Sequence, residues 1–172
     1  MSDRDTRFAE YFASRSGSMR GTAFLLCGDW HRAEDLVQET FTKLYLAWKR
    51  IDHHEALDQY TRKILVRTFL SQTRRGWFKR EQVTDTLPDV QSLDGHRIED
   101  QMELMRALEG VPPKQRAVLV LRFWEDMSIE QTGNLLNCSS GTVKSQASRG
   151  LQTLRGLLGA DYLTTSLEQE IA

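Results

Sequence analysis

Apolar side chains recur at the spacing of an α-helix along most of this 172-residue chain, and that period constrains its fold more than any other feature. Val37, Phe41, Leu44 and Trp48 stand at i, i+4, i+7 and i+11, which places them on one face of a helix. An earlier apolar group precedes Gly28, where we expect one helix to end and another to start. Only three prolines and few β-branched runs favour helices over a sheet. We therefore predict an all-α fold.

The helical period breaks in the middle of the chain. A third helix is predicted from Leu57 to about Trp77, and the segment that follows holds a proline, several aspartates and few large apolar residues. The period returns at Ile98, and Pro112-Pro113 opens a further helix that ends near Trp124, since proline is tolerated in a first turn. We predict two small helical domains, at residues 1–80 and 98–159. A flexible acidic linker, residues 81–97, joins them, and an acidic tail follows at residues 160–172.

The formal net charge of −1 conceals a strong asymmetry along the chain. Residues 1–80 carry a net charge of +5, residues 81–110 carry −6, residues 111–159 carry +3, and the tail carries −3. Two basic blocks separated by an acidic stretch indicate two surfaces that meet a polyanion.

The second domain contains a short helix, a tight turn and a longer helix. Ser128 and Gln131 have the spacing of a capping box, and Asn137 tolerates the left-handed backbone that a tight turn needs. Gly133 stands where two crossing helices require a small side chain, and the second helix is expected to begin near Ser140. This order predicts a helix-turn-helix.

Polar residues occupy the side of the second helix that faces away from its apolar stripe. They suit phosphates and base edges, although a plain solvated face is the alternative interpretation. The residues are Lys144, Ser145, Ser148 and Arg149, with Gln146 beside them.

Two further patterns lie in the first domain. Asp35, Gln38, Glu39 and Thr42 share one stripe, which is either a solvated acidic face or a surface for arginines of a protein partner. Residues 61–80 contain seven basic side chains, no acidic one, and interleaved aromatics, a pattern typical of contact with phosphates and unstacked bases.

Of the aromatic residues in and beside the basic stretch, we expect Tyr60 and Phe69 to be buried and only Trp77 or Phe78 to be exposed.

The sequence lacks the patterns typical of membrane proteins, metal-binding proteins and enzymes. The chain shows no signal pattern and no apolar run long enough for a membrane, so we expect a cytoplasmic protein without membrane insertion. Cys27 and Cys138 are expected to be small buried residues, and the four histidines lack metal-ligand spacing. With no phosphate-binding glycine loop and no nucleophile–base pair, we expect no metal, no cofactor and no catalytic residue.

From about Phe8 to Arg155 the chain resembles the extracytoplasmic-function sigma factors of the sigma-70 family, and within them the sigma-E-like subgroup. The stretches that carry the resemblance are AEDLVQETFTKLY at 33–45, VPPKQRAVLVLRFWEDMS at 111–128 and SSGTVKS at 139–145. The resemblance implies two helical domains, called region 2 and region 4, in a non-catalytic subunit of bacterial RNA polymerase.

The resemblance also implies roles for particular residues. Asp35, Gln38, Glu39 and Thr42 would bind the clamp helices of the largest polymerase subunit. The −10 promoter element would be melted at region 2, with contacts from Arg62, Lys63, Arg67, Arg74 and Arg75. The −35 element would be bound by Arg122, Thr142, Lys144, Ser145, Gln146, Ser148 and Arg149. Many members have an anti-sigma factor as a partner, so one is a hypothesis here.

The chain departs from the family pattern at three positions. Arg67 stands where an asparagine is expected, which affects base preference at the −10 element. Gln146 replaces a frequent arginine, and Asn137 replaces a commoner glycine.

Two alternatives to a sigma factor remain open at the level of sequence. A regulator that binds duplex DNA without polymerase would share the second domain, but the stripe around Asp35 and Glu39 would then have no role. An enzyme acting on nucleic acid would need catalytic groups that the sequence does not display.

Overall fold

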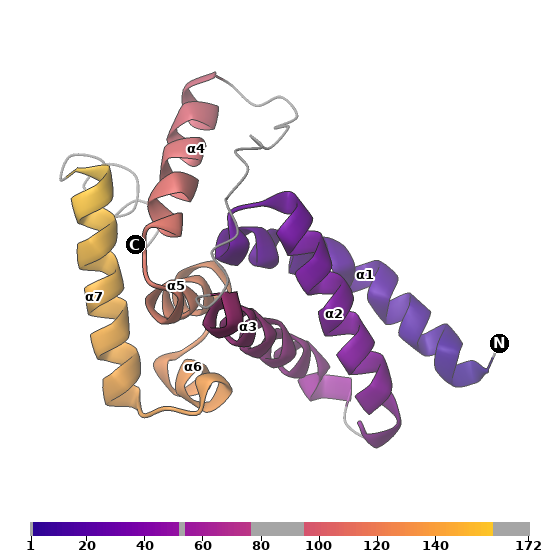
Figure 1. Ribbon diagram of the computed structural model, residues 1–172. Coiled ribbons are helices and arrows are strands. Elements are labelled where there is room, and N and C mark those ends of the chain that lie inside the picture. Colours follow the sequence, from indigo (N-terminus) through magenta and orange to yellow (C-terminus); the bar gives the residue numbers. More distant parts are fainter. Residues whose placement is uncertain (1, 52–53, 77–94, 160–172) are drawn as a thin grey trace. The chain divides into compact units, whose positions relative to one another are not determined.

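The computed structural model describes residues 2–51, 54–76 and 95–159, and these form helices without any strand (Figure 1). They belong to two compact units, which meet in the sequence between Gln82 and Val83. The predicted all-α fold class is confirmed. No helix in these described ranges is long and apolar enough to cross a membrane.

The first unit contains three long helices. Helix α1 (Asp3–Cys27) begins with a capping box between Ser2 and Asp5 and ends at Gly28, whose φ of 71° is left-handed. The Asp29 side chain then caps α2 (Trp30–Ala47) by accepting from the backbone N–H of His31 at 2.7 Å. The predicted break at Gly28 is therefore confirmed. Two short 3₁₀ turns, η1 (Trp48–Arg50) and η2 (His54–Ala56), lead into α3 (Leu57–Gly76).

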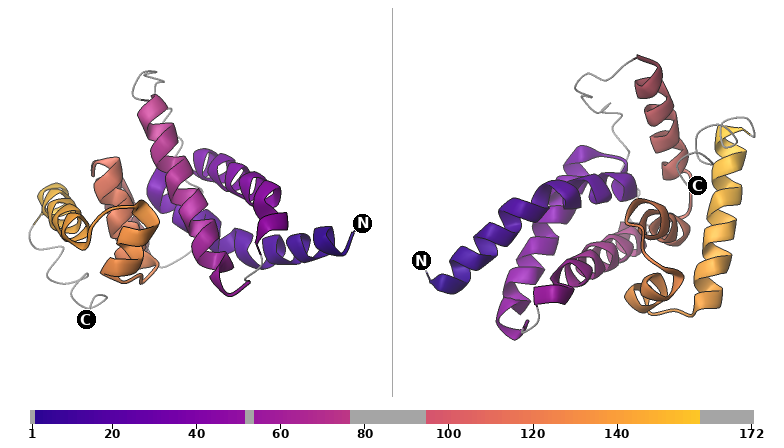
Figure 2. Two further views of the ribbon diagram at one scale, coloured as in Figure 1. Left: turned by 90° about the horizontal axis from the view of Figure 1, so that it is seen from below. Right: turned by 180° about the vertical axis from the view of Figure 1, so that it is seen from behind.

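Each of these three helices packs against the other two (Figure 2). The core between them is formed by fully buried leucines with Phe69, and α2 contributes Leu36 and Leu44. The apolar stripe of α2 also meets an aromatic cluster on α1, where the ring of Phe8 lies 5.3 Å from Trp48 and 5.0 Å from Tyr45. Apolar burial therefore holds α2 with its polar stripe outward.

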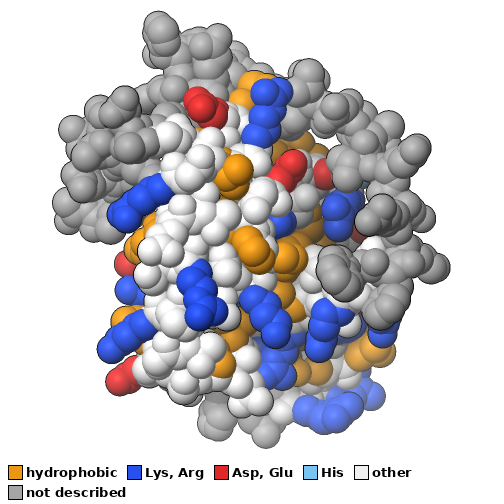
Figure 3. Space-filling view, turned by 60° about the vertical axis from the view of Figure 1, so that its left-hand side comes forward, with side chains coloured by type: hydrophobic (Ala, Val, Ile, Leu, Met, Phe, Trp, Pro, Cys, Tyr) orange, Lys and Arg blue, Asp and Glu red, His pale blue; other side chains and the backbone are white. Residues whose placement is uncertain are grey.

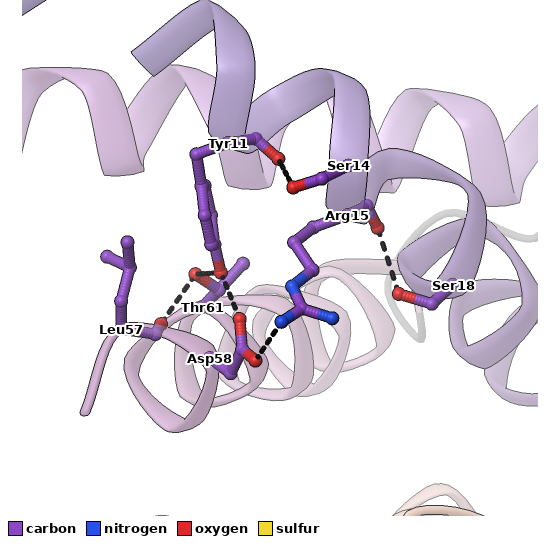
Figure 4. A network of polar contacts seen from close by, with 7 residues as sticks. All are labelled: Tyr11, Ser14, Arg15, Ser18, Leu57, Asp58 and Thr61. Atoms are coloured by element: carbon purple, nitrogen blue, oxygen red, sulfur yellow. Dashed lines mark hydrogen bonds and ion pairs between the residues drawn. The ribbon is translucent and has the colours of Figure 1, made fainter. Parts of the chain in front are cut away.

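A polar cluster joins α1 to the start of α3 (Figure 4). The Tyr11 hydroxyl donates to Asp58 at 2.8 Å and lies 2.9 Å from the Thr61 hydroxyl, which in turn lies 2.8 Å from the Leu57 carbonyl. Arg15 pairs with the other oxygen of Asp58 at 3.1 Å. Burial raises the pKa of Tyr11 to about 12, so its hydroxyl stays protonated over the physiological range.

The second unit consists of α4 (Gly95–Glu109), α5 (Pro113–Leu119), the π-helical turn η3 (Val120–Trp124), α6 (Ile129–Leu136) and α7 (Ser140–Leu158). Helix α7 packs against α4, α5 and α6. Pro112 is the N-cap of α5 and Pro113 is its first residue, so the predicted start at Pro112-Pro113 is confirmed. The buried Arg116 side chain donates to the carbonyls of Glu109 and Val111 and so satisfies the backbone between α4 and α5.

Some sequence predictions need correction. Helix α4 begins at Gly95, inside the segment that we predicted as linker. Tyr60 is 38% exposed because it lies beside a surface pocket, although Phe69 is buried as expected. Cys27 is buried, but Cys138 is only half-buried because it lies in the turn between α6 and α7. The rest of the predicted linker up to residue 94, Trp77, Phe78 and the tail 160–172 lie outside the described residues.

Candidate nucleic-acid interface

Both ends of α6 are fixed by local interactions. The hydroxyl of Ser128 accepts from the Gln131 N–H at 3.0 Å, and the Gln131 side chain accepts from the Ser128 N–H at 2.9 Å. At the other end of α6, Asn137 has a left-handed φ of 55°. A Cβ atom on Gly133 would stand 2.7 Å from the carbonyl oxygen of Cys138. The predicted need for a small residue at position 133 is confirmed, and the obstacle is the backbone of the α6–α7 turn.

The first turns of α7 present polar groups to solvent. The Ser139 hydroxyl caps the helix by accepting from the Thr142 N–H at 3.1 Å, and it lies 3.0 Å from the Thr142 hydroxyl. Lys144 and Arg149 are exposed on one face and Gln146 is half-buried at its edge. Ser145 and Ser148 share the face of the two basic residues.

Electrostatics favour an anion at this face. Helix α7 contains no Asp or Glu, and its N-terminus carries the positive end of the helix dipole. On the face drawn in Figure 3, lysine and arginine side chains are spread over the described surface with hydrophobic side chains between them. The face of α7 can therefore accept the negative charge of a nucleic-acid backbone.

Arg122 is partly engaged inside its own unit. Its guanidinium donates to the Met127 carbonyl and lies over the ring of Phe123 at 5.9 Å. The carbonyl belongs to the turn before α6, where Asp126 adopts a left-handed φ of 51°. No sequence pattern singled out this turn, although aspartate, like asparagine, is enriched among residues with a left-handed backbone.

The polar stripe of α2 forms an exposed face with an apolar end. Asp35, Gln38 and Thr42 are exposed, and the Thr42 hydroxyl donates to the Gln38 carbonyl at 2.8 Å. Leu46, one helical turn beyond Thr42, has 70% of its surface exposed. No sequence pattern singled out Leu46, although its position on the stripe could have indicated it.

Glu39 differs from the other members of the stripe. It is half-buried, and its two carboxylate oxygens meet Lys43 at 3.1 Å and the Gln72 amide at 2.7 Å. The hydrogen bond from Lys43 is the main reason that the pKa of Glu39 lies below its ordinary value. Glu39 therefore joins α2 to α3 as well as facing solvent.

The basic residues of α3 do not all share one face. Lys63, Arg67 and Arg74 follow Tyr60 along one side of the helix, whereas Arg62 points to another side. Beside Tyr60 lies a surface pocket of about 550 Å³, which no sequence pattern indicated. Its lining residues are Lys43, Leu46, Ala47, Arg50, Ile51, Ala56 and Tyr60. An exposed aromatic ring, an apolar wall and two cations can accommodate an unstacked nucleotide.

Comparison with known proteins agrees with the division into two units. Residues 12–79 match the family model for sigma-70 region 2, and residues 101–154 match the model for sigma-70 region 4. The RNA polymerase sigma-E factor of Streptomyces coelicolor is 36% identical over 95% of this chain and 93% of its own length. The sigma-E factor of Streptomyces avermitilis is 37% identical over 95% of this chain and 92% of its own length.

The chain belongs to the extracytoplasmic-function sigma factors of the sigma-70 family.

Two solved structures share the fold of this chain. The sigma factor RpoE of Bartonella quintana, crystallised with the anti-sigma factor NepR, is 27% identical, with a TM-score of 0.70 over 90% of this chain and 98% of that chain. CnrH, solved with the cytosolic domain of CnrY, has the same fold at 22% identity, with a TM-score of 0.63 over 91% of this chain and 90% of that chain.

In this sigma factor the region 2 match covers most of α1 and all of α2 and α3, and the region 4 match runs from α4 into α7. Within the described part of the chain, no group of three His, Cys, Asp or Glu residues could hold a metal ion. The candidate residues lie on α2 and α3 in one unit, and on α7 and the preceding turn η3 in the other.

Proposed function

We propose that this sigma factor is the promoter-specificity subunit of a bacterial RNA polymerase. It binds the core enzyme, recognises the −35 and −10 promoter elements, promotes DNA melting, and catalyses no reaction itself. The observation that carries the proposal is the exposed, acid-free face of α7 directly behind the tight α6–α7 turn. Because it acts on RNA polymerase, it works in the cytoplasm.

Recognition of the −35 element is assigned to α7. Its N-terminal half enters the major groove, where Lys144 and Arg149 contact phosphates or guanine edges. The hydroxyls of Thr142, Ser145 and Ser148 supply shorter contacts. Arg122 supports the face through the turn that it closes.

Binding of the core enzyme is assigned to the exposed stripe of α2. Asp35, Gln38, Glu39 and Thr42 offer carboxylate, amide and hydroxyl groups to cationic side chains on the clamp helices. Leu46 adds an exposed apolar residue at the end of the stripe. An apolar residue bordered by polar groups is a common arrangement at protein interfaces.

Binding of the melted −10 element is assigned to α3 and the neighbouring pocket. Tyr60 offers an aromatic face on which a base can stack. Lys63, Arg67 and Arg74 follow Tyr60 along one side of the helix and contact the phosphates of the single DNA strand. Arg62 and Arg75 lie away from this line and contribute general positive charge. Melting follows from tighter binding to the unpaired strand than to the duplex, which shifts the equilibrium toward open DNA.

An anti-sigma factor is a proposed further partner. The similar sigma factor of Bartonella quintana was solved with one bound, which supports a comparable complex here. Coexpression with the products of neighbouring genes, followed by size-exclusion chromatography, would identify it.

In-vitro transcription tests the proposal as a whole. Sigma-free core polymerase is incubated with genomic DNA from the source bacterium, with and without this sigma factor, and RNA 5′ ends are mapped. We expect new, discrete start sites that share upstream −35 and −10 elements. Absence of new starts, while a control sigma factor on the same core is active, would favour a DNA-binding regulator that acts without polymerase.

A further inference from the structure

Glu39 has partners within its own unit and also belongs to a surface proposed to bind another protein. It belongs to the proposed polymerase-binding stripe, yet each of its carboxylate oxygens already has a partner within region 2. Oε1 lies 3.1 Å from the Lys43 ammonium, and Oε2 accepts from the Gln72 amide at 2.7 Å. A cation on the polymerase that approaches Glu39 must therefore compete with Lys43.

Lys43 is held by two partners and also lines the pocket. Its Nζ atom is held by Glu39 and by the buried Thr68 hydroxyl, to which it donates at 3.0 Å. The same side chain lines the pocket beside Tyr60. An ammonium held at Glu39 and Thr68 is less available to a phosphate at the mouth of the pocket.

We propose that Glu39 couples polymerase binding to DNA binding by holding or releasing Lys43. In the free protein Glu39 retains Lys43, and in the complex a polymerase cation takes its place at Glu39. Lys43 then contacts the phosphate backbone of the strand in the pocket. The coupling is reciprocal, so a strand that draws Lys43 away leaves Glu39 available to the polymerase.

The restraint is modest because both groups are partly in solvent. The side chains of Lys43 and Glu39 are 48% and 43% exposed, and exposed pairs at i, i+4 contribute little. Releasing Lys43 should therefore raise the affinity of the free protein for single-stranded DNA by about twofold to threefold. This inference rests on the proposed role of the pocket in binding melted DNA.

The test measures binding of the full-length protein to a fluorescein-labelled single strand of about 12 nucleotides, without polymerase, by fluorescence anisotropy. Glu39→Gln should tighten binding, and the gain should disappear when Lys43→Gln is added. Thr68→Val removes the other anchor of Lys43 without changing charge, and it should also tighten binding, by a smaller factor.

Glu34→Gln is the matched control. Glu34 lies on the same helix and pairs with Arg20 at 2.7 Å, so its substitution removes the same charge and frees a cation away from the pocket. We expect a smaller effect than for Glu39→Gln. Equal gains from the two variants, or a Glu39→Gln gain that persists beside Lys43→Gln, would overturn the coupling. A wild-type protein that binds no single strand, while binding −35 duplex, would instead overturn the role of the pocket and the coupling with it.

Discussion

At the scale of single residues, Lys144 and Arg149 combine exposure, positive charge and position on the first turns of α7. Arg155 offers a comparison, because it is an exposed arginine on the same helix but lies near the C-terminal end of α7, about three turns beyond Lys144 and away from the α6–α7 turn. Residue type alone does not separate Arg149 from Arg155; their place on the helix does.

We expect Arg149→Ala to weaken binding to a −35 duplex by about 1–3 kcal/mol, the usual range for a lost contact to a base edge. Arg155→Ala should change the affinity much less. Fluorescence anisotropy with a promoter duplex measures both. Equal losses would mean that only the general positive charge of α7 matters.

Tyr11 provides a prediction about stability and pH. Tyr11→Phe removes the hydroxyl between Asp58 and Thr61 and should lower the free energy of unfolding by about 1 kcal/mol. Because folding raises the pKa of Tyr11 from 10.0 to about 12, its contribution is complete below pH 10 and is lost as the pH rises toward 12. Urea unfolding of the wild type and Tyr11→Phe at pH 8 and pH 11 should show that their free energies of unfolding differ less at pH 11. A difference that is independent of pH would contradict this role.

At the scale of elements, the α6–α7 corner depends on the absence of a side chain at Gly133. A methyl group there would meet a backbone carbonyl, which cannot turn aside as a side chain would. Gly156, in the last turn of α7, has no neighbouring atom within 4 Å of the same position. The two glycines therefore have opposite consequences when replaced.

Gly133→Ala should destabilise region 4 by about 1–3 kcal/mol through overpacking. Gly156→Ala should be neutral or stabilising by up to about 1 kcal/mol, since alanine is the better helix former. Chemical denaturation compares the two variants with the wild type. A neutral Gly133→Ala would mean that the turn relaxes more easily than its 2.7 Å contact indicates.

The polar face of α2 gives a second prediction at this scale. Asp35→Lys should abolish or strongly weaken binding to core polymerase without unfolding the protein, because Asp35 is exposed. Glu34→Lys, the same change at the adjacent position that pairs with Arg20 of α1, should leave most of the binding intact. Pull-down with sigma-free core, with circular dichroism as the folding control, separates them. Loss in both variants would indicate a general charge effect.

At the scale of the whole molecule, the net charge of −1 is a poor guide to its partners, because acidic residues 81–110 offset basic residues elsewhere. We expect binding to a −35 duplex to weaken as salt rises, with a slope of about −0.9 in log–log form for each phosphate contacted. With two such contacts, a fourfold rise in KCl should weaken binding about tenfold. A slope near zero would mean that binding does not involve phosphates.

The sequence by itself determined the features that depend on local spacing. Apolar period, capping residues and turn residues are interactions between near neighbours, so the helix break at Gly28, the cap at Ser128 and the left-handed Asn137 were all predicted and found. The face of α7 followed from the same period, because its apolar stripe leaves Lys144 and Arg149 outside.

Only the tertiary structure decided which neighbours those elements acquire. Tyr60 fits an apolar stripe in sequence, yet it borders a surface pocket because η1 and η2 bring Arg50 and Ala56 beside it. Glu39 belongs by spacing to the polar face of α2, yet packing against α3 gives it Gln72, 33 positions away. Such contacts depend on where separate helices meet, and no spacing along one helix encodes that position.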